Sequence, residues 1–173
     1  ANTSDKFPGH GVFEKSLPDG RKIVVVHLLG QRDMPMIGEN PFTYMDKLLK
    51  KYILGGNCAA ILVDYHAEVS AEKVALGHFL DGRVSVVVGT HTHVPTADYR
   101  ILKNGTVYQT DLGMCGNYDS VIGMQKEICI ERFVCGYSAR LVPAEGPATF
   151  SGLLAEIDDK TGLGISVQYI RGE

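Results

Sequence analysis

The sequence predicts an α/β domain in which strands and helices alternate along the first half of the chain. Three short segments, 21–29, 59–63 and 83–88, are rich in apolar and β-branched residues, as strands buried on both faces are. The two segments between them, 40–53 and 71–80, are bounded by residues typical of helix ends. This order of strand, helix, strand, helix and strand predicts a sheet with helices packed against it.

Turn residues precede the first of these strands. Residues 1–20 are rich in Pro, Gly and polar side chains, and they contain Pro-Gly and Asp-Gly pairs that are typical of turns. We therefore expect a short strand near 11–15 and a turn into the strand 21–29. Residues 30–39 hold Met, Pro and Gly without periodicity, which predicts a loop.

Capping residues set the expected ends of both helices. Asn40 is a favourable N-cap, and Pro41 suits the first helical position. A Gly-Gly pair at 55–56 is expected to end the first helix. Ser70 is expected to cap the second helix, which Asp81 and Gly82 then close. The apolar residues of the first helix recur with helical spacing at Met45, Leu48, Leu49, Tyr52 and Ile53.

The second half of the chain has a different character. Turn chemistry within 101–110 predicts a hairpin, and 125–134 is expected to be a third helix. Residues 153–157 and 165–170 flank a polar, Gly-containing turn and predict a terminal hairpin.

Composition limits the class of protein. The chain has 173 residues, of which 45% are hydrophobic and 21% charged, as expected for one globular domain. Its formal net charge of -3 provides no basic field for duplex nucleic acid. The longest apolar run, about seven residues, is far below the roughly 20 that span a bilayer. No signal peptide is visible, and four cysteines without a Cys-x-x-Cys pair suggest reduced thiols in a cytoplasmic protein.

Histidines follow two of the three apolar strands. His66 comes just after 59–63, and His91 and His93 come just after 83–88. The carboxyl ends of strands in an α/β sheet are where ligand sites lie, so these three side chains are predicted to converge on a metal. Imidazole suits several transition metals and does not identify one. A lone His-x-His is more often a pair of ordinary histidines, but a third histidine at a parallel strand end favours a metal site.

Neighbouring residues support this hypothesis to different degrees. Thr90 and Thr92 have hydroxyls that could contact phosphate oxygens or orient the imidazole rings. Glu68 and Asp64 flank His66 and could orient a ring, although solvated or capping roles fit them equally well. His27, inside an apolar strand, is expected to be a hydrogen-bonded core histidine.

Several segments carry a family resemblance by their sequence and their order along the chain. They include LVDYHAE at 62–68, VVVGTHTHV at 86–94, ADYRIL at 97–102 and TDLGM at 110–114. These segments resemble the C-terminal part of the YmdB-like family of bacterial calcineurin-like metallophosphoesterases. The resemblance implies a calcineurin-like sandwich of β-sheets flanked by helices. It also implies two divalent ions (Fe, Mn, Zn or Mg), with His66 and His91 on one and His93 on the other.

The chain departs from the family pattern in one large respect. The family's metal-binding Asp, its bridging Glu with an adjacent Asn, and its Gly-Asn-His motif with the catalytic acid all precede the matching part. We therefore expect residues 1–173 to be the C-terminal part of a single metallophosphoesterase domain that lacks its N-terminal strands. No catalytic residue is assigned here, because the acid His is expected in the missing segment. Glu39-Asn40 imitates the bridging pair, but Asn40 already suits an N-cap.

The number and charge of the metal ligands in this chain determine the activity that we expect from it. Two close ions need shared anionic ligands, and three neutral imidazoles supply none. The chain alone is expected to be inactive, and to associate with the missing segment or with further copies of itself. The completed enzyme is expected to hydrolyse small phosphodiesters such as 2′,3′-cyclic or other cyclic nucleotides, without a membrane or duplex nucleic acid as partner. The alternatives are a mononuclear three-His hydrolase and a non-catalytic metal-binding or assembly module.

Overall fold

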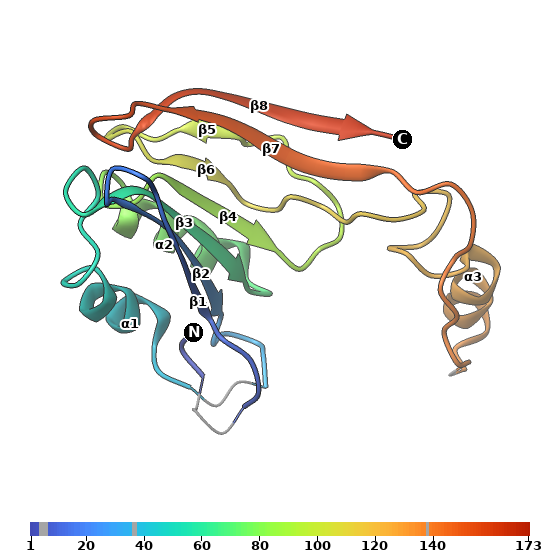
Figure 1. Cartoon of the computed structure of the whole chain (residues 1–173). Coiled ribbons are helices and arrows are strands. Elements are labelled where there is room, and N and C mark those ends of the chain that lie inside the picture. Colours follow the sequence, from blue (N-terminus) through green and yellow to red (C-terminus); the bar gives the residue numbers. More distant parts are fainter. Residues whose placement is uncertain (4–6, 36–37, 138) are drawn as a thin grey trace.

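The computed structural model describes residues 1–3, 7–35, 38–137 and 139–173. These residues form a six-stranded sheet, a two-stranded sheet and three helices (Figure 1), which confirms the α/β class. In chain order the elements are β1 (Val12–Ser16), β2 (Lys22–Leu29), α1 (Pro41–Leu48), β3 (Cys58–His66), α2 (Ser70–Leu80), β4 (Val86–Thr90), β5 (Arg100–Ile101), β6 (Val107–Gln109), α3 (Lys126–Cys135), β7 (Phe150–Ile157) and β8 (Gly164–Gly172).

Parallel strands form the middle of the larger sheet. Its order is β1-β2-β3-β4-β6-β5; the pairs within β2-β3-β4-β6 are parallel, and the edge strands β1 and β5 run antiparallel to their neighbours. The register places His27 opposite Asp64 and His66 opposite Thr90. The carboxyl ends of β2, β3 and β4 therefore meet at one edge, where ligand sites of α/β sheets lie.

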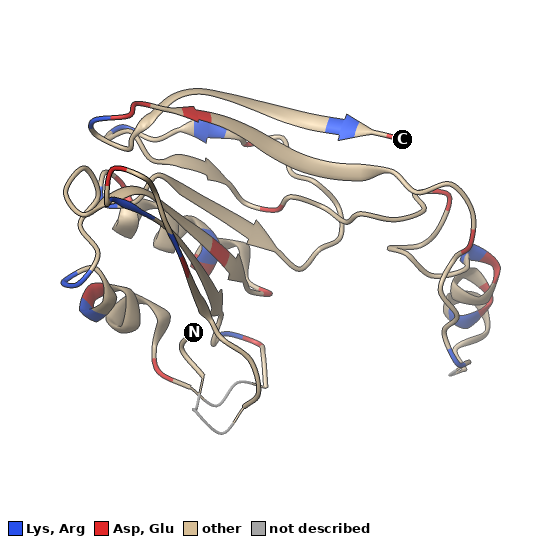
Figure 2. Ribbon diagram, viewed as in Figure 1, with Lys and Arg blue, Asp and Glu red and all other residues tan. Residues whose placement is uncertain are grey.

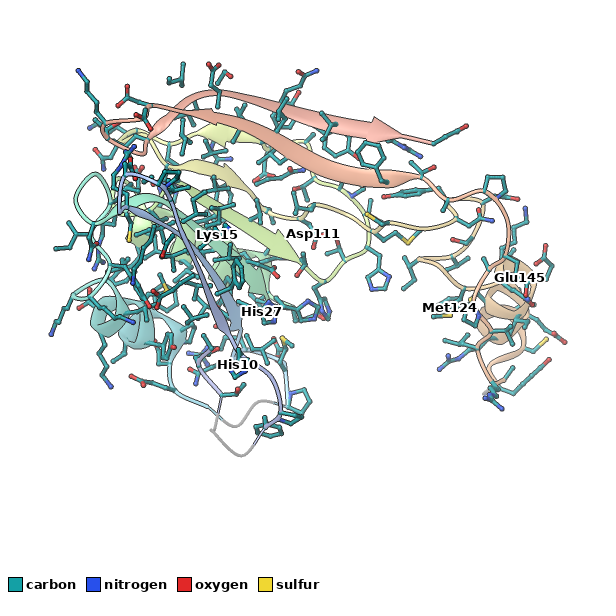
Figure 3. All side chains as sticks on the ribbon, in the orientation of Figure 1. His10, Lys15, His27, Asp111, Met124 and Glu145 are labelled. Atoms are coloured by element: carbon teal, nitrogen blue, oxygen red, sulfur yellow. The ribbon has the colours of Figure 1, made fainter. Side chains whose placement is uncertain are left out.

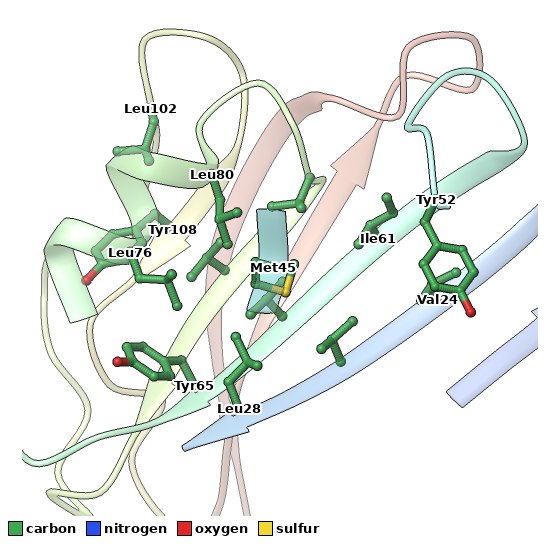
Figure 4. Close-up of a cluster of buried hydrophobic side chains, with 14 of the residues drawn as sticks. Val24, Leu28, Met45, Tyr52, Ile61, Tyr65, Leu76, Leu80, Leu102 and Tyr108 are labelled. Atoms are coloured by element: carbon green, nitrogen blue, oxygen red, sulfur yellow. The ribbon is translucent and has the colours of Figure 1, made fainter. Parts of the chain in front are cut away.

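Helices α1 and α2 lie on one face of this sheet. Strand side chains alternate between the two faces, so every second residue of β2 and β3 points into the helical layer and packs near Met45 and Leu76. Figure 4 shows this cluster of buried side chains. At roughly 1.5–3 kcal/mol for each large apolar side chain removed from water, the cluster is a major source of stability. Its strand members include Val24, Val26, Leu28, Ile61, Val63 and Tyr65.

The hairpin of β7 and β8 lies over the opposite face of the larger sheet (Figure 1). An apolar cavity of about 370 Å³ separates the layers, and Leu62, Val88 and Leu153 are among the residues that line it. The Ser151 hydroxyl donates to the carbonyl of Leu112 at 2.9 Å and ties β7 to the segment that follows β6. The described chain thus has a helical layer, a central sheet and a covering hairpin.

Residues 117–137 and 139–148 form an extension that we call the arm, and the other described residues are the body. The arm leaves and rejoins the body at a bridge between Gly116 and Thr149, and it carries α3 away from both sheets (Figure 1). Cys129 is the buried residue of α3, whereas Phe133 is 84% exposed and Val134 78% exposed. The third predicted helix, 125–134, is therefore confirmed to within a residue, but it adds little buried apolar surface.

The predicted helix ends need two corrections. The first helix ends at Leu48 and does not continue to Ile53, because Tyr52 turns into the core and the Ile53 N–H donates to the Asn57 side chain. Asn40 is the N-cap as predicted, accepting from the backbone N–H groups of the first turn. Ser70 is not the cap of the second helix: Val69 holds that position, and its carbonyl accepts the first bonds.

The predicted strands are present with shifted ends. The segment 59–63 is part of the longer β3, because pairing with β2 and β4 continues as far as His66. The predicted strand 83–88 begins three residues before the observed strand. The Arg83 N–H donates to the carbonyl of Leu80 in a turn, and β4 begins at Val86. Both predicted hairpins, at 101–110 and at the C-terminus, are confirmed.

Charged residues of both signs are interspersed along the ribbon (Figure 2), in keeping with the small net charge. Exposed ion pairs account for several of them, such as Lys47 with Glu39 and Lys126 with Asp119. Among the described residues, no helix has the length and apolar character that crossing a bilayer requires.

Candidate metal centre at the ends of β3 and β4

Two of the three predicted ligand histidines face each other at the carboxyl edge of the sheet. His66 is the last residue of β3, and His91 follows the last residue of β4. The ring atom Nδ1 of His91 lies 3.3 Å from Nε2 of His66, and the two rings meet edge to face at 67°. The parallel register of β3 and β4 brings them together, although 25 residues separate them in the chain.

The hydrogen-bond partners of these rings are compatible with a tautomer pair that leaves two facing nitrogens free to bind a cation. Thr90 Oγ1 lies 3.0 Å from Nδ1 of His66 and 3.4 Å from a carboxylate oxygen of Asp64. When this hydroxyl donates to Asp64, it accepts from Nδ1 of His66. Nε2 of His91 pairs with the carboxylate of Glu68. In these tautomers Nε2 of His66 and Nδ1 of His91 both present lone pairs, an arrangement that is favourable when a proton or a cation lies between them.

The spacing of these two nitrogens fits a shared metal ion. Ligand nitrogens sit about 2.0–2.1 Å from zinc, so two of them at a tetrahedral angle are roughly 3.4 Å apart. The observed 3.3 Å is close to that value. Carboxylates or hydroxyls that hold the far nitrogen of a ligand histidine are a common feature of metal sites, and Glu68 and Thr90 occupy those positions here.

Burial also favours the ligand form of His66. Desolvation lowers the pKa of this imidazole, and the neighbouring His91 lowers it further. A depressed pKa keeps the ring neutral, and only a neutral imidazole has a lone pair for a metal. The electrostatics and the geometry therefore point in the same direction.

The third histidine does not join this pair. Nδ1 of His93 lies 2.8 Å from the backbone carbonyl of Ile122 in the arm. Across the described ranges, no three His, Cys, Asp or Glu side chains are grouped so that they could hold a metal ion. The structure therefore brings two of the three predicted ligands together, and the convergence of all three histidines stays a prediction.

The remaining candidate residues have defined positions. Thr92 bonds to Val94 through its hydroxyl and to Asp111 through its backbone N–H, so it shapes the loop. His27 is exposed, not in the core as expected, because it lies on the sheet face opposite the helices. Its Nδ1 pairs with Asp64 at 2.8 Å (Figure 3 shows it near the end of β2).

Sequence reasoning missed a buried ion pair beneath the histidine loop. Lys73 of α2 and Asp111 after β6 are 1% and 0% exposed, and their charged groups are 3.1 Å apart. Figure 3 shows Asp111 in the segment that leaves the sheet. The partners are 38 positions apart in the chain, and no local pattern signals their contact.

These features define a class: an α/β domain with a candidate metal centre at the carboxyl edge of a largely parallel sheet. The chain matches the family model described as YmdB-like protein over residues 1–170, and it belongs to that family. The predicted resemblance is thereby confirmed.

Individual relatives agree with the family match. The chain is 42% identical to the 2′,3′-cyclic-nucleotide 2′-phosphodiesterase of Bacillus subtilis (strain 168), over 98% of this chain and 63% of that protein. It is 38% identical to a putative phosphatase/phosphodiesterase of Mycoplasma pneumoniae, over 98% of this chain and 61% of the relative. The chain thus spans less than two thirds of the length of either relative.

Solved structures extend the agreement to the fold. A hypothetical protein from Thermus thermophilus superimposes with a TM-score of 0.86 at 36% identity, over 99% of this chain and 65% of the other. A novel phosphatase from Mycoplasma pneumoniae gives a TM-score of 0.86 at 35% identity, over 98% and 61%. The predicted fold class, a mixed α/β sheet flanked by helices as in phosphatases, is confirmed.

Proposed function

We propose that this chain is part of a metal-dependent phosphodiesterase that hydrolyses small phosphodiesters, including 2′,3′-cyclic or other cyclic nucleotides. The observation that carries the proposal is the approach of two ring nitrogens from neighbouring strand ends, Nε2 of His66 and Nδ1 of His91, to 3.3 Å. Membership of the YmdB-like family and the activity for which the Bacillus subtilis relative is named support the substrate class.

In this proposal the chain's residues have separate roles. His66 and His91 bind one divalent ion, and His93 binds a second after its ring leaves the carbonyl of Ile122. Glu68 and Thr90 hold the far nitrogens of the first two rings and so fix their orientation. When bound, two such ions supply the nucleophile and offset the charge of the phosphoryl oxygens.

The anionic part of the centre comes from outside these residues. Glu68, an acidic residue in contact with the pair, already holds the Nε2 atom of His91. A bridging carboxylate and a catalytic acid are therefore supplied by the part of the longer relatives that this chain does not span, either as a further segment or as a separate polypeptide. A homo-oligomer is compatible with the same arrangement. The mononuclear three-His alternative is less favoured, because His93 is directed to the arm.

Cation binding and hydrolysis together test the proposal. Binding of Co²⁺ or Mn²⁺ to the purified chain is measured by equilibrium dialysis, and hydrolysis of 2′,3′-cyclic AMP is measured after mixing with the complementary part of the Bacillus subtilis relative. His66→Ala and His91→Ala should each weaken cation binding at least about tenfold. His78→Ala, an exposed histidine on α2, is the matched control and should change nothing.

The two measurements have separate consequences. Hydrolysis by the mixture should disappear with EDTA and return with added metal. A mixture that hydrolyses no phosphodiester with any divalent ion would overturn the enzymatic part of the proposal. Cation binding without hydrolysis would then favour the non-catalytic metal-binding module.

A further inference from the structure

Asp111 is a buried carboxylate with three donors around it. One oxygen accepts from Nζ of Lys73 at 3.1 Å and from the backbone N–H of Thr92 at 2.9 Å, and the other accepts from the N–H of Gly113 at 3.0 Å. A charge taken out of water is tolerated only when it is paired and hydrogen-bonded in this way. One of these donors, Thr92, lies between the candidate ligands His91 and His93.

The body is shaped to let Lys73 reach this carboxylate. Lys73 comes from α2 on the helical face, whereas Asp111 follows β6 in the sheet. At Gly89 near the end of β4, a Cβ atom would lie 2.7 Å from Cδ of Lys73 and 1.9 Å from the carbonyl oxygen of Thr110. The absent side chain at Gly89 therefore leaves the space through which the lysine passes, so three elements converge on one ion pair.

The loop that Asp111 contacts has an unfavourable backbone conformation. His91 has φ 148° and His93 has φ 64°, both in the region that residues with a side chain rarely adopt. Such conformations are strained and persist only when the surroundings hold them. The bond from the Thr92 N–H to Asp111 lies between these two residues and fixes the backbone there.

We propose that Lys73 and Asp111 are positioning residues that hold the loop 89–93 in the conformation its histidines need to bind a cation. The inference rests on the proposed function for the identity of what the loop binds. The anchoring itself is a property of the metal-free protein. Lys73 neutralises and orients Asp111, and Asp111 in turn holds Thr92.

A purely structural ion pair would make a different prediction. If the pair contributed only to stability, then any uncharged pair of similar shape would serve equally well, because apolar replacements of buried ion pairs are often neutral or stabilising. If Asp111 holds the loop, the replacement must keep a hydrogen-bond acceptor for Thr92. Two double variants separate these cases, K73M/D111N and K73M/D111L. Both remove the two charges, and both side chains at position 111 branch at Cγ, but only Asn retains an acceptor oxygen.

Amide hydrogen exchange at Thr92 is measured first, by NMR on the metal-free chain. We expect exchange at Thr92 to be at least about tenfold faster in K73M/D111L than in the parent, with K73M/D111N close to the parent. Affinity for Co²⁺ should follow the same order, with a loss of at least about tenfold in K73M/D111L. Thermal unfolding of both doubles establishes that each is folded. R83M/D46L, which removes an exposed ion pair elsewhere, should leave exchange and affinity unchanged.

Equal exchange rates at Thr92 in the two double variants would overturn the inference. It would also be overturned if their exchange rates differed but both bound Co²⁺ with the same affinity. If the parent chain binds no cation at all, the proposed function fails while the exchange data still decide whether Asp111 anchors the loop. If K73M/D111L does not fold, it is replaced by K73M/D111A, with Thr92 exchange as its readout. In that case, exchange faster than in K73M/D111N is expected, because Ala has no acceptor oxygen for the Thr92 N–H, and equal exchange would contradict the anchoring.

Discussion

The body and the arm differ in what determines their conformation. In the body, strand pairing and burial connect residues far apart in the chain, as in the contact of His66 with His91. In the arm, the hydrogen bonds are mostly local: the Asp119 N–H donates to Asn117, and the Gly123 N–H donates to Ser120. The two regions also look distinct in Figure 1, where α3 stands apart from the sheets.

The comparison shows where precise geometry can come from in this chain. A ligand pair needs atoms held to within a fraction of an ångström, which requires side chains fixed by packing and hydrogen bonds. The body meets this requirement at His66 and His91. His93 is held by a carbonyl of the arm, at Ile122, which itself has φ 48°. His93, the candidate ligand that lies outside the pair, is thus the one whose position depends on the arm.

Replacing one glycine in the body and one at the base of the arm by alanine tests this comparison. The first of these substitutions has the largest expected effect on the free energy of unfolding. Gly89→Ala in the body places a Cβ atom 1.9 Å from the Thr110 carbonyl oxygen, so we expect destabilisation of about 4 kcal/mol or more. Gly116→Ala, at the base of the arm, meets nothing within 4 Å and should change the free energy of unfolding by less than about 1 kcal/mol. Urea unfolding of both variants measures the difference. Equal midpoints would show that the two regions are not distinct.

Much of the body was predictable from local sequence signals. Runs of β-branched residues located β2, β3 and β4, and Asn40 with Pro41 located the start of α1. Element ends were less predictable, because tertiary contacts override local preference. Tyr52 has helical spacing with Met45, yet it leaves the helix for the core and bonds with Glu14, 38 residues away.

The candidate site was predictable only in part for a similar reason. Histidines at two strand ends can be located in the sequence, and parallel pairing makes their approach expected. The contact of Lys73 with Asp111 depends on α2 lying over β4 and on the space at Gly89, which no local pattern records. The bond of His93 to Ile122 depends on the path of the arm, which has too few buried contacts to be inferred from periodicity.

Shortening one apolar side chain in the body and one in the arm is expected to have the next largest effect on the free energy of unfolding. The two variants compare how much each side chain's burial stabilises the fold. Leu76 of α2 is fully buried, so Leu76→Ala should cost about 3 kcal/mol from lost burial and the cavity left behind. Ile130 of α3 is 56% exposed, and Ile130→Ala should cost less than about 1 kcal/mol. Both values come from denaturant unfolding monitored by circular dichroism. A large cost at Ile130 would mean that the arm packs against something, such as a second copy of the chain.

A smaller effect concerns acid stability on the β1 side of the body. Glu14 has a pKa lowered from 4.5 to about 2, first by its bond to Lys22 and then by bonds to Tyr52 and Lys51. A depressed folded pKa means that this contribution to stability is complete above about pH 4.5 and is lost as the pH falls towards 2. The melting temperature of Glu14→Gln should therefore lie below that of the parent near neutral pH and converge with it near pH 2. Parallel melting curves across this range would contradict the assignment.

The smallest expected effect is at the most exposed apolar residue of the arm. Phe133 is 84% exposed, so Phe133→Ser should change the free energy of unfolding by no more than about 0.5 kcal/mol. A difference above about 1 kcal/mol that grows with protein concentration would instead indicate self-association through this face, because binding to the folded form stabilises it by mass action. Repeating the unfolding at protein concentrations that differ by about a hundredfold separates these outcomes. An unchanged, concentration-independent stability would show that the Phe133 side chain makes no stabilising contact in solution, either within the chain or with a second copy.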